Sequence, residues 1–301
     1  MTAEGQGHLA MLLFSALVAG SFSLGSMAAN ELAPEALNAL RFWLAGAVLG
    51  ALLLVRGGVP RQALGAPWRY LILAGLFVTY FVLMFEGLKT APPVSAAAVF
   101  TLTPLVSALF GYLLLRQRMT ARIAAGLVLG GIGALWVIFR ADLVAFLAFD
   151  LGRGEAIYFV GCVSHAIYTP MVRRLNRGEG PLVFSFLTIL TGAVLLTFVA
   201  WPALRATDWA AVPSIVWITI VYTALFASAA TFVLLQFASL RLPSSKVMAY
   251  TYLTPSWVIL WELALRGTLP PPLILVGVAL TVLALLLLLR REAEPAAQPQ
   301  G

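Results

Sequence analysis

One histidine lies in the middle of a long apolar stretch, between side chains that carry hydroxyl groups. His165 follows Ser164, and Tyr168 comes one helical turn later. An imidazole in this setting can donate a hydrogen bond to a carboxylate, or it can carry a proton, because its pKa lies near neutrality. The alternative is a packed histidine that hydrogen-bonds to hydroxyls of its own helix. We predict that His165 and Tyr168 line a binding cavity, and we favour proton transfer by His165 less.

Aromatic and apolar side chains in three other segments could complete such a cavity. Tyr80 lies near the middle of an apolar stretch, where a buried phenol needs a partner and offers a flat ring face. Phe100 and Leu102 come just before a proline, and Tyr252 and Trp257 flank another. Tyr252 and Trp257 project in different directions from one helix, so we expect no more than part of this segment to line a cavity. Core packing is the alternative interpretation for all five side chains.

These residue types restrict the possible chemistry. Neutral hydrogen-bonding groups beside aromatic faces suit a substrate that is zwitterionic, or neutral with an apolar part. A metal ion would need clustered carboxylates or histidines, and the sequence has neither. The single cysteine, Cys162, excludes an internal disulfide and any CxxC site. The HExxH, GxSxG and Walker motifs are absent, so we expect no cofactor, no enzymatic activity and no ATP hydrolysis by this chain.

Long apolar segments must position these residues. The chain is 61% hydrophobic and 10% charged, whereas soluble domains carry roughly a quarter charged residues. A membrane-spanning helix needs about 20 mostly apolar residues. Ten segments qualify: 9–27, 36–55, 69–88, 94–115, 122–139, 155–172, 182–201, 213–237, 245–265 and 272–289. The sequence therefore predicts an all-α membrane protein with ten transmembrane helices.

Two of these segments repeat one pattern. Phe100–Arg116 reads FTLTPLVSALFGYLLLR and Thr251–Gly267 reads TYLTPSWVILWELALRG, so that the two Leu-Thr-Pro sequences align. Pro104 and Pro255 should each kink a helix, because proline removes a backbone hydrogen bond. Matching kinks in two halves are sites where transporters with inverted repeats bend or bind substrate, so we expect gating here, with a static kink as the alternative.

The repeat also divides the chain. The two Leu-Thr-Pro sequences fall in the fourth and ninth segments, which makes the repeating unit five helices long. Five is an odd number, so the second unit must enter the membrane from the opposite face. We expect a first repeat over residues 1–139, a linker at 140–154, a second repeat at 155–290, and a disordered tail at 291–301.

Polar side chains separate inner from outer segments. They gather in the first, third, fourth, sixth, eighth and ninth, whereas the fifth and tenth have almost none and should lie outside. Gly126 and Gly130 form a GxxxG pattern in the fifth segment, which permits close helix packing. We favour packing within one chain over a dimer seam, and expect a monomer or a weak dimer.

Three charged residues lie within or at the ends of apolar segments. Arg41 comes less than two turns into the second, and we expect its guanidinium to extend to the membrane interface in a structural role. Binding of a substrate carboxylate is the less favoured alternative. Glu86 ends the third segment, and Glu262 precedes Arg266 by four residues, a favourable helical pairing. We expect both carboxylates at the interface.

The net charge of +7 reflects membrane orientation and not nucleic-acid binding, because the basic residues form short clusters between apolar segments. With the N-terminus in the cytoplasm, most Lys and Arg residues fall on the cytoplasmic side. Both termini are then cytoplasmic. The protein is predicted to span a bacterial-type inner membrane many times.

Several sequence features resemble the drug/metabolite transporter superfamily and its EamA-type members. They are Pro34-x6-Arg41-Phe42 with Ala45, the Gly87-Leu88-Lys89 connector, the Leu-Thr-Pro helix that ends at Arg116, and the glycine-rich fifth segment. The chain from Leu9 to Arg290 most resembles exporters of the YddG type, which carry aromatic amino acids and other metabolites. This resemblance implies ten helices in two EamA-type halves and a central cavity lined by helices 1, 3, 4, 6, 8 and 9. The family's usual tryptophan before Gly20 is Ala19 here, so its role does not carry over.

The main hypothesis is a secondary transporter that exports amino acids, aromatic and other neutral ones, by alternating access. A carrier of the same fold for drugs or nucleotide sugars is the first alternative. A membrane-embedded enzyme or a scaffold is the second.

Overall fold

The computed structural model describes residues 2–117, 120–148 and 150–289, and every regular element within these ranges is a helix. The long uninterrupted helices are α1 (Ala3–Ala28), α2 (Pro34–Val55), α3 (Trp68–Leu88), α6 (Ala121–Ile138), α8 (Arg153–Leu175), α9 (Pro181–Ala206) and α14 (Pro272–Leu289). Two short elements, η1 (Arg61–Leu64) and α7 (Leu143–Leu147), lie in connections. The predicted all-α class is confirmed. The tail predicted at 291–301 lies outside the described residues.

Three further helices are interrupted. The series are α4 (Pro93–Phe100) with α5 (Thr103–Leu115), α10 (Ser214–Ala224) with the π-helix η2 (Leu225–Ala230) and α11 (Thr231–Ser239), and α12 (Ser244–Ala249) with the 3-10 helix η3 (Tyr250–Leu253) and α13 (Thr254–Arg266). Two of these breaks come directly before the predicted proline kinks. Pro104 cannot donate to the carbonyl of Phe100, and the Thr103 hydroxyl donates to that oxygen instead, at 2.6 Å.

Among the described residues, eight helices are long and apolar enough to cross a membrane: α1, α2, α3, α4–α5, α6, α9, α10–α11 and α14. The other two predicted spans, 155–172 and 245–265, fall on α8 and on α12–α13. α8 carries an acidic residue in its first turn and two basic residues in its last turn, and η3 interrupts the second series. The structure thus identifies a multi-pass membrane protein with eight spans that meet these criteria, and ten spans stay a prediction.

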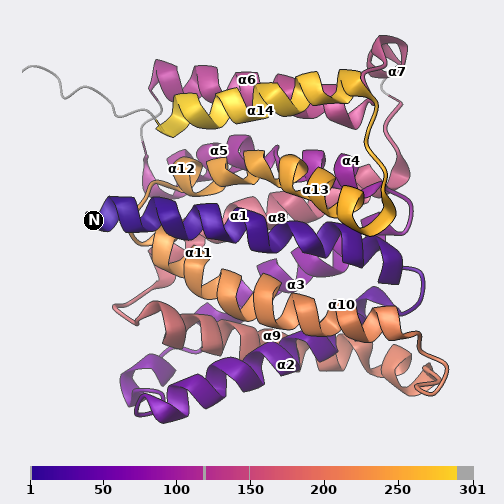
Figure 1. Cartoon of the computed structure of the whole chain (residues 1–301). Coiled ribbons are helices and arrows are strands. Elements are labelled where there is room, and N and C mark those ends of the chain that lie inside the picture. Colours follow the sequence, from indigo (N-terminus) through magenta and orange to yellow (C-terminus); the bar gives the residue numbers. More distant parts are fainter. Residues whose placement is uncertain (1, 118–119, 149, 290–301) are drawn as a thin grey trace, which may run out of the picture.

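The helices pack side by side as a bundle, with one helix pair on each flank. α6 and α14 pair on one side, α2 and α9 pair on the other, and α1, α3 and α8 lie between them (Figure 1). The contact of α3 with α8 has a counterpart in the contact of α11 with α1. The contact of α5 with α8 likewise has a counterpart in the contact of α13 with α1. Each counterpart is found when every helix is replaced by the helix at the equivalent place in the other half of the chain.

Glycines allow the flank pair α6 and α14 to approach closely. A Cβ atom on Gly133 would lie 2.6 Å from the carbonyl oxygen of Gly277, and one on Gly126 would lie 2.9 Å from the Leu288 side chain. The Gly126 site of the GxxxG pattern is therefore occupied by a helix of the same chain, which is the interpretation that the sequence favoured.

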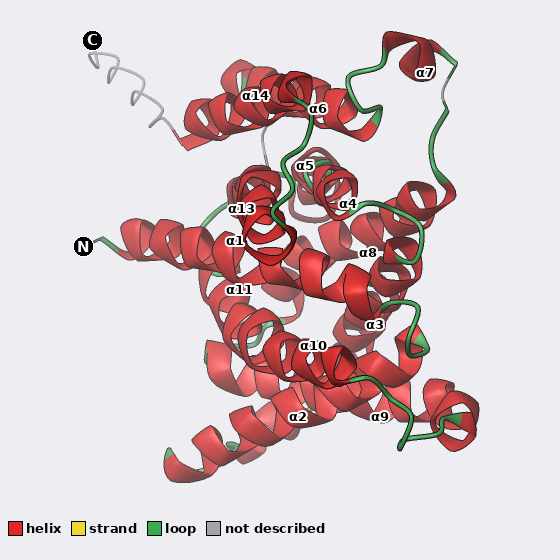
Figure 2. Cartoon of the chain, turned by 45° about the vertical axis from the view of Figure 1, so that its right-hand side comes forward, coloured by secondary structure: helices red, strands yellow, loops and turns green. Residues whose placement is uncertain are grey.

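Connections gather at the two ends of the bundle, and α7 stands clear of the long helices (Figure 2). We call the end at which α1 begins the N-terminal end. It also carries η1 and the α8–α9 connection, whereas α7 lies at the opposite end (Figure 1). The interior between the two ends is where α1, α3, α8 and α11 converge.

Candidate substrate-binding site

A small cavity marks the centre of the bundle. Its volume is about 10 Å³, and its walls come from α1, α3, α8, η2 and α11. The lining side chains are Phe14, Val18, Phe77, Tyr80, Phe81, His165, Ala227, Thr231, Phe232 and Leu235. This space holds about one water molecule, so the structure shows the centre closed around its own side chains.

Aromatic rings fill the space around the cavity, and Phe77 is their hub. Its ring lies perpendicular to that of Tyr168, with centroids 3.9 Å apart, and edge-to-face with His165 at 5.3 Å. Phe232 approaches Phe77 at 4.2 Å from the second half of the chain. Edge-to-face and offset geometries are the favourable arrangements of aromatic pairs. We call Phe77, Tyr80, His165, Tyr168 and Phe232 the central aromatic cluster.

His165 is buried in this cluster without a polar partner on Nδ1 among the described residues. Rings of Phe77, Tyr80 and Phe100 surround it. The Ser164 hydroxyl donates to the Leu76 carbonyl at 2.9 Å and is thus engaged elsewhere. Buried polar atoms are normally hydrogen-bonded, so an unpaired nitrogen beside a cavity is a candidate ligand contact.

Two tyrosines of the site have polar partners from other helices. The hydroxyls of Tyr80 and Tyr158 lie 3.1 Å apart, which joins α3 to α8. Gln236 on α11 donates to the Tyr168 hydroxyl at 2.7 Å. Its own carbonyl oxygen has no partner among the described residues. Phe100 stacks beside Tyr80 at 5.8 Å, so α4 also reaches the site.

The structure therefore brings together Tyr80, Phe100, His165 and Tyr168. We did not predict Phe77, Phe81, Phe232 and Tyr158 as site residues from the sequence. A signal was present in α3, where aromatic residues at positions 77, 80 and 81 have the three- and four-residue spacing of one helix face. Phe232 has no such signal, because its position depends on how α11 packs against α3.

Three other predicted site residues lie outside this cluster. Tyr252 faces the flank pair: a Cβ on Gly130 of α6 would meet its ring, and its carbonyl accepts from Thr281 of α14 at 3.0 Å. Trp257 donates to Ser15 Oγ at 3.2 Å, which joins α13 to α1. Leu102 is half-buried in the break between α4 and α5.

Arg41 departs most from its predicted position. We expected its guanidinium to reach the interface, and this expectation was wrong, because the side chain is fully buried. Nε donates to Ser228 Oγ at 2.6 Å and Nη2 donates to the Ala227 carbonyl at 2.6 Å. The guanidinium also lies 3.8 Å above the centre of the Phe81 ring. The widened π-turn of η2 supplies the acceptors and explains why an arginine is held here.

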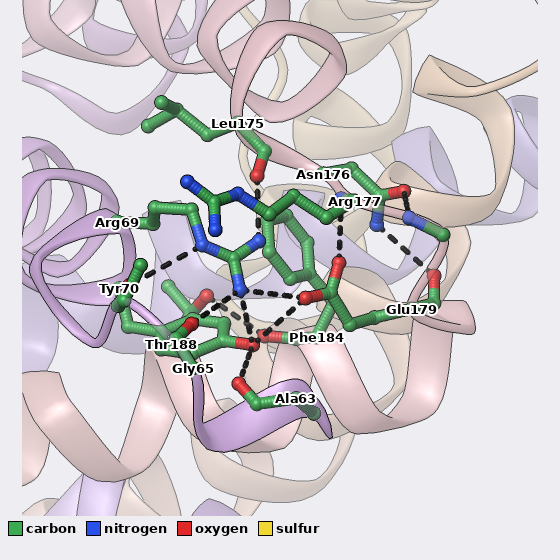
Figure 3. A network of polar contacts seen from close by, with 12 residues as sticks. Ala63, Gly65, Arg69, Tyr70, Leu175, Asn176, Arg177, Glu179, Phe184 and Thr188 are labelled. Atoms are coloured by element: carbon green, nitrogen blue, oxygen red, sulfur yellow. Dashed lines mark hydrogen bonds and ion pairs between the residues drawn. The ribbon is translucent and has the colours of Figure 1, made fainter. Parts of the chain in front are cut away.

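Charged groups at the two ends of the bundle form ion pairs, and one of these pairs joins separate elements. Arg69, at the start of α3, donates to Glu179 at 2.6 Å and to the Leu175 carbonyl at 2.7 Å, which joins it to the α8–α9 connection (Figure 3). At the opposite end, Glu262 pairs with Arg266 at 3.7 Å, as its spacing predicted. Glu86 is half-exposed and pairs with Lys89.

Partial burial of Glu179 on its own favours the neutral form of the carboxyl group. The hydrogen bonds from the Arg69 side chain and from the Arg177 backbone outweigh this effect and hold the pKa of Glu179 below its usual value. The network in Figure 3 thus links α3 to the α8–α9 connection through an ion pair at the N-terminal end of the bundle.

The sequence profile of the EamA-like transporter family matches residues 5–139 and 152–290. The chain belongs to this family. EamA-like proteins are membrane transporters of the drug/metabolite transporter superfamily, so this chain is a membrane transporter.

Individual relatives agree with the family. The EamA-like chain is 27% identical to the uncharacterized transporter YyaM of Bacillus subtilis over 93% of its own length and 92% of the relative. It is 30% identical to the aromatic amino acid exporter YddG of Ancylobacter novellus over 68% and 71% of the two chains. A transporter of Chlamydia muridarum, named for S-adenosylmethionine and S-adenosylhomocysteine, is 31% identical over 52% and 50%. One crystal structure shares the fold with a TM-score of 0.71 and 24% identity, and covers 95% of both chains.

Proposed function

We propose that this EamA-like transporter exports amino acids, aromatic and other neutral ones, across the bacterial inner membrane. The central aromatic cluster carries this proposal. Its rings offer faces and edges to an aromatic or aliphatic side chain. The unpaired His165 Nδ1 and the unpaired Gln236 oxygen offer hydrogen bonds to the polar end of a substrate.

The side chains that line the central cavity favour amino acids over cationic drugs as substrates. A cationic drug in a membrane interior calls for a buried carboxylate as its counter-charge. The residues that line the central cavity include neither aspartate nor glutamate. The relationship to YddG supports the same substrate class, since that protein is named for aromatic amino acids.

Alternating access is the mechanism that we propose. The contact pattern survives an exchange of the two halves, and the family profile matches each half, which supports two repeats at 1–139 and 155–290 with opposite orientations. In such a carrier the halves rock around a central site. The breaks before Pro104 and Pro255 are the proposed bending points, and the N-terminal end faces the cytoplasm.

A second candidate substrate class has the same amino acid group and differs in the side chain. The relationship to the S-adenosylmethionine transporter favours an amino acid that carries a purine ring, because stacked aromatic side chains also accept a nucleobase. Competition by adenosylated amino acids against phenylalanine flux tests this class directly.

The test is flux through the purified protein in liposomes, measured with labelled neutral amino acids. We expect saturable flux, greatest for aromatic amino acids, and a loss of at least about tenfold in a His165→Ala, Tyr80→Ala variant. Tyr112→Ala is the matched control, since this tyrosine on α5 is 57% exposed and lies outside the cluster. Absence of saturable flux for every amino acid would refute the substrate class. Normal flux in the double variant would refute the site.

A further inference from the structure

Two arginines are fully buried in the described part of the chain, and they differ in one respect. Arg69 forms an ion pair with Glu179 at 2.6 Å. Arg41 forms no ion pair among the described residues, and its partners are neutral: Ser228, Ala227 and, at 3.4 Å, the Asn38 side-chain oxygen. A guanidinium carries more N–H donors than these three acceptors satisfy. Arg41 is thus a cation without a counter-ion inside the bundle.

A buried cation without a counter-ion is energetically unfavourable. Removing a charge from water has a large free-energy cost, and burial is normally offset by a partner of opposite charge. Charged side chains inside membrane segments pair with one another or with backbone carbonyls, and they mark substrate and ion pathways. The neutral acceptors and the Phe81 ring reduce the cost, but they leave the net positive charge in place.

Arg41 contacts residues that line the central cavity. Phe81 lies under its guanidinium and Ala227 accepts its hydrogen bond, and both residues line that cavity. On the cavity's other walls are Tyr80 and His165. A molecule that enlarged the cavity by displacing Phe81 would thus have aromatic rings around it and would reach the Arg41 guanidinium behind that wall.

We propose that Arg41 binds the carboxylate of the substrate, and that it forms the anionic subsite of a pocket whose apolar part is the central aromatic cluster. The ligand class is a carboxylate that carries an aromatic or other apolar group. This inference rests on the proposed function for the identity of the transported amino acids, whereas binding of the carboxylate can be tested separately.

The hydrogen bonds between Arg41 and the π-helix η2 predict that substrate binding also changes the conformation of this segment. Ser228 and Ala227 offer the guanidinium neutral acceptors, whereas a carboxylate adds the attraction of a full opposite charge, so a carboxylate competes with both for Arg41. Those two acceptors belong to η2, and Arg41 holds this widened turn between α10 and α11. Binding of substrate therefore releases η2 from α2 and couples occupancy to the conformation of the α10–α11 helix.

The first experiment compares phenylalanine with its methyl ester in the liposome assay, because the ester keeps the ring and loses the carboxylate charge. Wild type should transport the acid in preference to the ester, and Arg41→Gln should lower this preference roughly ten- to a hundredfold, the range for charge-assisted hydrogen bonds. Arg69→Gln, the matched buried arginine, should change both rates by the same factor. An unchanged preference in Arg41→Gln overturns the inference and leaves amino acid export standing.

The second experiment does not depend on transport. Binding of 3-phenylpropionate to the purified protein is followed through the rise in unfolding temperature. Wild type and Arg69→Gln should be stabilised, and Arg41→Gln should not. Stabilisation without amino acid flux would refute the proposed function but support this site. Ser228→Ala keeps the arginine and removes a competing acceptor, so it should tighten binding of 3-phenylpropionate, and weaker or unchanged binding overturns the inference even where Arg41→Gln does not fold.

Discussion

The rings of Tyr80 and His165 lie 4.4 Å apart, with their planes inclined by 31°. Tyr80 belongs to α3 in the first half of the chain and His165 to α8 in the second, so this pair joins the two halves at the centre of the bundle. A ligand that enters between α3 and α8 must separate the two rings. The closed centre is therefore formed by the same side chains that we propose to hold the substrate.

Replacing Phe77 by alanine should destabilise the closed centre. Its ring contacts Tyr168, His165 and Phe232, and loss of a buried phenylalanine costs about 3–5 kcal/mol of folding free energy. Thermal unfolding of the purified protein measures this loss. Phe198→Ala on α9 is the control, because that ring is 78% exposed on the bundle surface and its removal should have little effect. Equal unfolding temperatures for the two variants would contradict the packing described for Phe77.

The Arg69–Glu179 pair should make stability depend on pH in the acid range. The pKa of Glu179 is lower in the folded protein than in the unfolded chain, so the carboxylate stabilises the fold fully above the unfolded-state pKa of about 4.3. This stabilisation is lost as the pH falls through the lower folded-state pKa. Unfolding temperatures of wild type and Glu179→Gln, measured across pH, should differ at pH 7 and converge in acid. A constant difference down to the folded-state pKa would contradict this assignment.

The flank pair offers a comparison between two neighbouring glycines. A Cβ on Gly133 would lie 2.6 Å from the Gly277 carbonyl, whereas one on Gly131 would meet no atom within 4 Å. Gly133→Ala should force α6 and α14 apart and destabilise the protein by about 1–3 kcal/mol. Gly131→Ala should be neutral or slightly stabilising, because alanine favours helix over glycine. The comparison is made by thermal unfolding, and equal effects of the two substitutions would show that α6 and α14 are not in this close contact.

Orientation in the membrane can be tested with single cysteines. In a Cys162→Ala background, a cysteine in place of Arg56, at the N-terminal end, should stay protected from a membrane-impermeant maleimide in intact cells. A cysteine in place of Arg205, near the opposite end of α9, should be labelled. Disruption of the cells should expose both sites, which controls for local accessibility. The reverse pattern would place the N-terminal end outside the cytoplasm.

The sequence by itself determined that this is a membrane protein made of helices, because hydrocarbon surroundings demand long apolar segments with internal backbone hydrogen bonds. It also located the breaks at Pro104 and Pro255, since loss of a backbone donor is a local property of the chain. Single residues of the site, Tyr80 and His165 among them, were recognisable as polar or aromatic groups in apolar segments.

Only the tertiary structure decided which of these residues meet. Tyr80 and His165 face each other, whereas Tyr252, an equally plausible candidate by type, turns to α6 and α14, because the side of a helix that faces the centre is set by packing between helices. The case of Arg41 is the clearest. Its position less than two turns into the second apolar segment suggested the interface, but its surroundings depend on the π-turn at Ser228, which lies 187 residues away along the chain. Composition and spacing do not record that contact, and it is the contact that places a cation beside the central cavity.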